Sequence, residues 1–146
     1  MAHRVLAGVM TVSCVTALLV GASGSVAQAG AVTYVTYNCY HVRTAPRSIM
    51  FACADAGFYV KRLDWARWGV RTASADGVFH QNDCDPNCAA GTFRSRRGTI
   101  TLSGRLWCPS IKEHVFKRVR AVYRHPLNGQ AGYSGQLFCP LGASAR

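Results

Sequence analysis

Acidic side chains are scarce in this sequence. Only 6 of its 146 residues are Asp or Glu, and Glu113 is the single glutamate. This shortage argues against sites that need many carboxylates, such as a high-affinity Ca²⁺ cage. The common enzyme signatures G-x-S-x-G, H-E-x-x-H and the phosphate-binding loop are also missing from the sequence. We therefore expect a protein that is not an enzyme, with no catalytic residue, no metal and no cofactor.

The sequence also lacks an apolar run long enough to span a bilayer. The longest run, Val5 to Val20, has 16 residues, whereas a spanning helix needs about 20. It follows the positively charged start Met1–Arg4 and precedes small residues that end in Ala27-Gln28-Ala29. This order is typical of a secretory signal peptide. We expect residues 1–29 to be cleaved, and Ala29-Gly30-Ala31 offers a second cleavage site two residues later.

Cleavage would leave one domain, residues 30–146, in a secreted, extracellular protein. The chain has 7 cysteines, and cleavage of the signal peptide would remove Cys14. We interpret Cys14 as part of the apolar run rather than as a lipid attachment site. An even set of cysteines in an exported chain is typical of disulfide bonds. Domain ends often lie close together, so we favour a Cys39–Cys139 pair and leave the other pairings open. The expected disulfide cysteines are Cys39, Cys53, Cys84, Cys88, Cys108 and Cys139.

The polar segment from Asn82 to Ala89 has a zinc alternative. His80, Cys84 and Cys88 follow one another at four-residue steps and could supply three ligands. An oxidising compartment favours a disulfide over a thiolate site, so we expect no zinc.

The same segment partly matches a Ca²⁺-binding loop. Asp83, Asp85 and Asn87 occupy the first three ligand positions, but Cys88 stands at the sixth position instead of Gly and Arg94 at the twelfth instead of Glu. Arginine at the bidentate position would repel the cation. We interpret the segment as a disulfide-locked loop with Asx turns, in which side-chain oxygens accept nearby backbone N–H groups.

Short segments rich in β-branched and aromatic residues, separated by turn signals, predict an all-β fold, either a small sandwich or a barrel. Asp76-Gly77 reads as a turn, and 126–135 reads as a long loop. Alternation directs Ile100 and Leu102 to one face. The expected strands are 32–37, 49–53, 58–68, one that returns from Val78, 99–102, 114–123 and an edge strand 136–139.

Basic residues are abundant, and most of them are arginine. The net charge is +11, and the lysines are Lys61, Lys112 and Lys117 alone. Arg118 and Arg120 would project from one strand face about 7 Å apart, which suits successive phosphates or sulfates along a polyanion. The alternative is that the charge merely keeps a small exported protein soluble near an anionic envelope. The candidate polyanion-binding residues are Arg94, Arg96, Arg97, Lys117, Arg118, Arg120 and Arg124.

Two tryptophans, Trp65 and Trp68, are interleaved with Arg67. Such residues can stack on sugar rings or nucleobases. On a strand, these two tryptophans would point to opposite faces, so we expect at most one of them in the core. In 114–123, alternation places Val115, Val119, Ala121 and Tyr123 on one face and Phe116, Arg118, Arg120 and Val122 on the other.

Three motifs carry a family resemblance. They are Phe51-Ala52-Cys53-Ala54-Asp55, Leu63-x-Trp65-x-x-Trp68-Gly69 and Asn82-Asp83-Cys84-x-Pro86-Asn87-Cys88-Ala89-x-Gly91. In this order and spacing they resemble a family of small secreted, cysteine-containing actinobacterial proteins of unknown function. The resemblance spans residues 49–123. It implies an exported actinobacterial protein and carries over no catalytic residue.

The sequence thus favours a secreted binding or structural protein that associates with anionic cell-envelope polymers or other polyanions. A small secreted hydrolase acting on nucleic acid is one alternative. Glu113 and His114 point to opposite strand faces and do not form an acid–base pair by themselves, so His41, His80 or His125 would have to converge with them. An inhibitor or toxin-like module that binds a protein partner through the Cys84–Cys88 loop is the other alternative.

Overall fold

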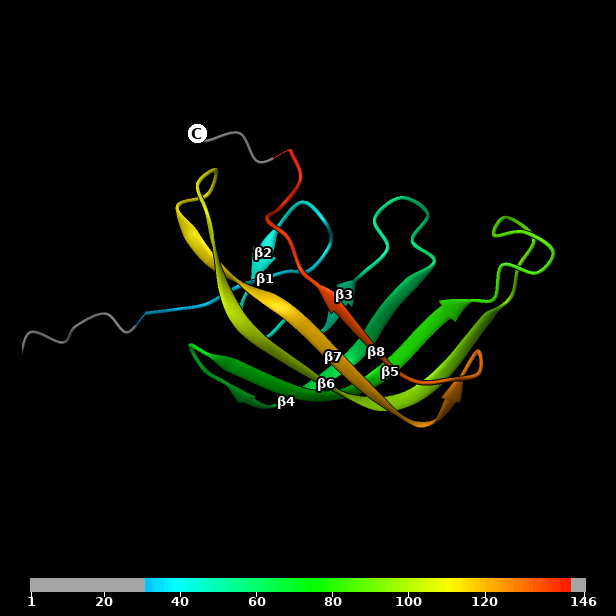
Figure 1. Cartoon of the computed structure of the whole chain (residues 1–146). Helices are drawn as coiled ribbons and strands as arrows, with labels where there is room; N and C mark the ends of the chain where they lie inside the picture. The colour runs from blue at the N-terminus through cyan, green and yellow to red at the C-terminus, as the bar shows by residue number, and fades with distance from the viewer. Residues whose placement is uncertain (1–30, 143–146) are drawn as a thin grey trace, which may run out of the picture.

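The computed structural model describes residues 31–142, and the signal-peptide prediction for residues 1–29 lies outside the described residues. Strands β3 to β8 form one antiparallel sheet in chain order, and β1 pairs with β2 in a small second sheet (Figure 1). Residues 31–142 contain no helix and therefore no helix that could cross a membrane. The strands are β1 (Val35–Thr36), β2 (Val42–Arg43), β3 (Ser48–Met50), β4 (Phe58–Trp68), β5 (Thr72–Asn82), β6 (Phe93–Cys108), β7 (Glu113–Leu127) and β8 (Gln130–Gln136).

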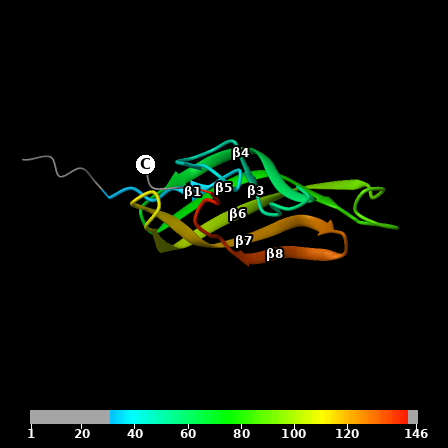
Figure 2. The same ribbon diagram turned by 90° about the horizontal axis from the view of Figure 1, so that it is seen from above.

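The six-stranded sheet curls into a half-barrel, so the all-β prediction is confirmed (Figures 1 and 2). The curl brings the two ends of the sheet together. The Tyr133 ring on β8 lies 4.8 Å from Phe58 on β4 and 5.6 Å from Phe51, centroid to centroid. Two irregularities in β4 add residues to that strand, and such bulges bend a strand and increase its twist.

The core fills the concave face of the sheet. Phe79, Ile100 and Leu102 are fully buried there, as the alternation predicted for Ile100 and Leu102. Val35 of β1 and Ile49 of β3 cover this side, so the short N-terminal strands complete the core. Each such side chain contributes about 1.5–3 kcal/mol through burial. The expected strands 32–37 and 49–53 are thus shorter in the structure, where they reduce to β1 and β3.

Alternation fails at one position of β7. Val119, Ala121 and Tyr123 are buried as predicted, but Phe116 is also fully buried, instead of sharing the exposed face of Arg118. Its ring meets Trp68 edge-on at 5.4 Å. Val115 and Phe116 are both buried, so the alternation of buried and exposed residues is interrupted at this point of β7. The interruption lies near Gly104 of β6, whose φ of 67° is outside the extended range of a regular strand.

The Asp76-Gly77 prediction is wrong, because both residues lie within β5 and the chain instead turns between β4 and β5. A Cβ at Gly77 would lie 2.9 Å from the side chains of both Val60 and Leu63. Glycine stands here because these core side chains occupy the space above the strand. Close packing, and not a turn, explains this residue.

The expected loop 126–135 is also wrong. β7 continues to Leu127 and β8 returns from Gln130, so the predicted edge strand 136–139 begins where β8 ends. Asn128 and Gly129 connect them with φ values of 46° and 78°. Positive φ at both central residues defines the tight hairpin turn that Asn-Gly favours. The Gly- and Ser-rich composition hid this signal.

Trp65 and Trp68 both pack against the core, so the expectation that they lie on opposite faces is wrong. The pairing register shifts between Trp65 and Arg67, and this extra residue restores both rings to the same side. The rings meet edge-on at 4.5 Å. Their N–H groups donate to the carbonyls of Pro46 and Thr33 at 2.8 and 3.1 Å. The two tryptophans are therefore structural and do not form an exposed stacking surface.

Disulfide bonds join all six cysteines, as expected, but the favoured Cys39–Cys139 pair is wrong. The pairs are Cys39–Cys53, Cys84–Cys88 and Cys108–Cys139. The two ends of the domain do meet, since the Leu141 N–H donates to the Cys39 carbonyl at 2.7 Å. A backbone hydrogen bond makes this contact, because Cys139 instead reaches Cys108 at the end of β6.

Candidate polyanion-binding face

The convex side of the half-barrel carries the candidate site. An antiparallel sheet can bury one face and expose the other to solvent. We call the side opposite the core the outer face and define it by the exposed residues of β4 to β8 that point away from the core. Arginines occur on three of its strands: Arg62 and Arg67 on β4, Arg97 on β6, and Arg118, Arg120 and Arg124 on β7.

Strand register explains how residues far apart in the sequence become neighbours on the outer face. Arg67 lies opposite Ser74 on β5, which lies opposite Thr101 on β6. Thr101 in turn lies opposite Arg120 on β7. One row of cross-strand pairs thus begins and ends with arginine and carries hydroxyl side chains between them. These hydroxyls are further donors for anionic oxygens.

A shallow hollow of about 240 Å³ lies on the outer face between Arg62, Arg97 and Arg124. Asp64 and Asp76 also line it. The Asp76 carboxylate accepts a hydrogen bond from the Thr99 hydroxyl at 2.6 Å. Its other oxygen lies 3.8 Å from the Arg124 guanidinium. Thr99 and Arg124 thus hold Asp76 and partly balance its charge.

Arg62 reaches this hollow because of the bulge in β4. Its φ is 55°, and the pairing register shifts between Lys61 and Asp64. The extra residue lets Leu63 enter the core while Arg62 stays exposed. Arg62 and Arg67 are not among the polyanion-binding residues predicted from the sequence. The predicted strand 58–68 could have indicated Arg67, but no local pattern indicates the bulge.

The structure divides six of the seven predicted residues between two sides. Arg97, Arg118, Arg120 and Arg124 lie on the outer face, whereas Arg94 and Arg96 point to the other side of β6. Arg94 forms an ion pair with Asp83 at 3.3 Å. Arg96 donates to the Pro126 carbonyl at 3.1 Å. Lys117 is exposed next to Arg118 but does not continue its alternation.

Positive charge on the outer face is only partly balanced. In the part of the chain that the structure describes, Arg124 is the only outer-face arginine within 4.0 Å of a carboxylate oxygen. His80, also on this face, responds to the field. Burial lowers the pKa of its imidazole, and the charges of Lys61 and Arg62 lower it further. The histidine is therefore neutral at pH 7, and the cationic character of the face comes from its arginines and Lys61.

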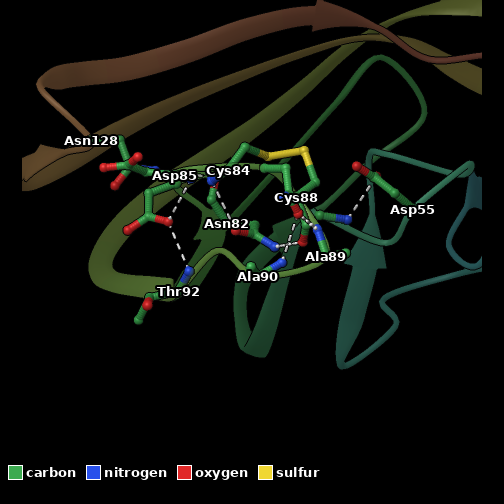
Figure 3. The surroundings of a disulfide bond; sticks show 12 residues. Asp55, Asn82, Cys84, Asp85, Cys88, Ala89, Ala90, Thr92 and Asn128 are labelled. Atoms are coloured by element: carbon green, nitrogen blue, oxygen red, sulfur yellow. Dashed lines mark hydrogen bonds between the residues drawn. A yellow bond between two sulfur atoms is a disulfide. The ribbon is translucent and has the colours of Figure 1, made fainter.

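The Cys84–Cys88 loop uses its polar side chains internally (Figure 3). Asp83 accepts the Thr92 N–H at 2.7 Å, and Asn87 accepts the N–H groups of Ala89 and Ala90 at 3.1 and 3.0 Å. The hydrogen bond from the Thr92 backbone is the main reason that the pKa of Asp83 is lowered. The predicted Asx turns are confirmed. Oxygens of Asp83 and Asn87, which a Ca²⁺ loop would direct at the ion, here accept hydrogen bonds from backbone N–H groups.

The cysteines of the zinc alternative and the Glu113–His114 pair of the hydrolase alternative lie in different parts of the fold. Cys84 and Cys88 are oxidised to a disulfide, and His80 Nδ1 lies 2.8 Å from the Ser95 hydroxyl. Residues 31–142 hold no group of three or more His, Cys, Asp or Glu arranged to bind a metal ion. Glu113 lies opposite Cys108 at the start of β7, at the other end of the strand from Arg124. The neighbouring His114 ring packs on Trp107 at 5.0 Å.

Comparison with protein-family models, with curated proteins and with solved structures finds no match to this chain. The resemblance to small secreted actinobacterial proteins therefore stays a prediction from the three sequence motifs.

Proposed function

We propose that this chain is a secreted, non-catalytic binding protein whose outer face holds an anionic polymer, such as an anionic polymer of the cell envelope. The observation that carries the proposal is the gathering of arginines from β4, β6 and β7 on one uncovered sheet face, with Asp64 and Asp76 as the acids of its hollow. Three disulfide bonds support an extracellular location, where such bonds persist.

The geometry suits an extended, multiply charged ligand better than a small one. The hollow is shallow, and the arginines spread along and across three strands. Arg118 and Arg120 stand at alternate positions of β7, about 7 Å apart. A guanidinium group can donate two parallel hydrogen bonds to a phosphate or sulfate. Several such contacts along one polymer would provide the affinity that no single pocket on this face provides.

The test is binding to a defined polyanion, heparin, over a series of salt concentrations. Each phosphate-like contact contributes about 0.7–0.9 to the slope of log affinity against log salt concentration. We expect the double variant Arg118→Gln/Arg120→Gln to bind more weakly and to lower this slope by about 1.4–1.8. The matched control is Arg94→Gln/Arg96→Gln, which removes the same charge from the other side of β6. The salt dependence of this control should be steeper than that of the Arg118→Gln/Arg120→Gln variant.

Two results would contradict the proposal. Binding that does not depend on salt would exclude an ionic interface. Equal losses in the two double variants would show that net charge, and not the outer face, determines binding.

A further inference from the structure

Three aromatic rings continue the outer face toward the Cys84–Cys88 loop. Tyr59 on β4 lies opposite His80 on β5, and their rings stack with centroids 4.8 Å apart and planes 19° apart. Phe93, the first residue of β6, lies 5.6 Å from Tyr59. We call these three residues the aromatic strip. It lies on the same face as Arg97 because Phe93 and Arg97 are four positions apart on one strand, and every second side chain of a strand points to the same face.

The aromatic strip is not part of the core. Phe93 is 44% exposed, so part of its ring faces solvent. The Lys61 ammonium lies 4.8 Å from the centroid of the Tyr59 ring. The Ser95 hydroxyl contacts the His80 ring nitrogen at 2.8 Å. The rings are thus held in position by polar neighbours and by one another, while the Phe93 ring remains open to a ligand.

We propose that the polymer bound by the outer face is a single-stranded nucleic acid, with a base stacked on Phe93 and phosphates bound by Arg62 and Arg97. This inference rests on the proposed function and names its ligand. Proteins that bind single strands combine a cationic path for the backbone with aromatic rings for the bases. The outer face has both parts, and they lie side by side.

The separation of rings and charges favours a nucleic acid over a sulfated glycan. Phe93 and Arg97 are four positions apart on β6, which places them about 13 Å apart along an extended strand. In a nucleic acid the planar group and the charged group are likewise separate. In a sulfated sugar the charges lie on the ring itself, so cations would have to surround each aromatic. Among residues 31–142, Lys61 is the only cation that lies over the face of a ring of the strip.

The experiment compares two fluorescent oligonucleotides of equal length and charge by anisotropy. One carries thymine bases and the other is abasic at every position. We expect the wild-type protein to bind the thymine strand about tenfold more tightly, since one stacked base accounts for such a difference. Phe93→Ala should remove this preference while leaving binding to the abasic strand unchanged.

The matched control is Phe138→Ala, because Phe138 is 38% exposed and lies after β8, outside the strands that carry the strip. It should keep the full preference for thymine. Urea unfolding of both variants verifies that each remains folded.

The outcomes separate the two proposals. Equal, salt-dependent binding of the thymine and abasic strands would overturn the nucleic-acid inference and leave the polyanion function standing. Absence of binding to both strands and to heparin would overturn the polyanion function itself. Tighter binding to heparin than to the thymine strand, weakened by Phe93→Ala, would overturn the inference in favour of a sulfated glycan.

Discussion

The three disulfide bonds should differ in their contribution to stability in a way that their loop lengths determine. Cys108–Cys139 closes a loop with a sequence separation of 31, whereas Cys84–Cys88 spans a separation of 4. A disulfide stabilises mainly by lowering the conformational entropy of the unfolded chain, and this effect increases with the logarithm of loop length. We therefore predict that replacing Cys108 and Cys139 together by Ala costs far more than replacing Cys84 and Cys88.

The loop lengths set the magnitude. Loop-closure entropy gives about 3.7 kcal/mol at 25 °C for the longer loop and about 1.9 kcal/mol for the shorter one. The surroundings of the two disulfide bonds increase this difference in unfolding free energy. Cys108 is fully buried, and Cys139 follows Leu137, which packs into the core. Cys88 is exposed on a surface loop outside the core, so its replacement opens no cavity. The expected difference in unfolding free energy is therefore at least about 1.8 kcal/mol.

The assay is equilibrium unfolding in urea of the wild type and the two double-alanine variants, followed by circular dichroism. Double replacement avoids leaving an unpaired thiol that could exchange with the remaining disulfides. Peptide mapping of the unreduced protein gives an independent check on the three pairs. Equal free energies for the two variants, or a larger loss for Cys84→Ala/Cys88→Ala, would refute the reasoning. A mapped Cys39–Cys139 peptide would refute the connectivity itself.

Three further predictions concern single positions. Tyr123→Phe should raise the free energy of unfolding by about 1 kcal/mol, because the Tyr123 hydroxyl is buried with no hydrogen-bond partner among the described residues; lower stability in urea would contradict this. Gly98→Ala should lower it by about 1–3 kcal/mol, because the new Cβ would clash with the Val122 carbonyl; unchanged stability would show that the sheet can move. Burial and nearby cations lower the pKa of His80, so an NMR titration should give a midpoint below 6.5. The free energy of unfolding should therefore fall as the pH falls from 6.5 through that midpoint, and His80→Gln should remove this pH dependence.

Strand alternation and composition predicted much of this fold. The stretch 58–68 forms β4, and Ile100 and Leu102 face the core as their spacing indicated. These predictions succeed because side chains alternate across a strand, so burial of one face is visible in a local window of sequence. The shortage of acids and the excess of arginine likewise indicated a cationic surface, which is a property of composition.

The wrong predictions concern residues whose placement is determined by contacts with residues distant in the chain. Gly77 has the local signature of a turn, but the side chains of Val60 and Leu63 are the reason for a glycine there. Trp65 and Trp68 share a face only because a register shift lies between them, and the strand that defines this shift is β5. A single sequence window contains no information about such pairings.

The sequence by itself determined the all-β class, the use of six cysteines in disulfides and the basic character of the chain, because each follows from local pattern or composition. Only the tertiary structure decided which cysteines pair and which arginines act together. It joined Arg62, Arg97 and Arg124 around one hollow and turned Arg94 and Arg96 away. The physical reason is that strand register, bulges and curl set which side chains meet in space, and these depend on contacts between segments far apart in the chain.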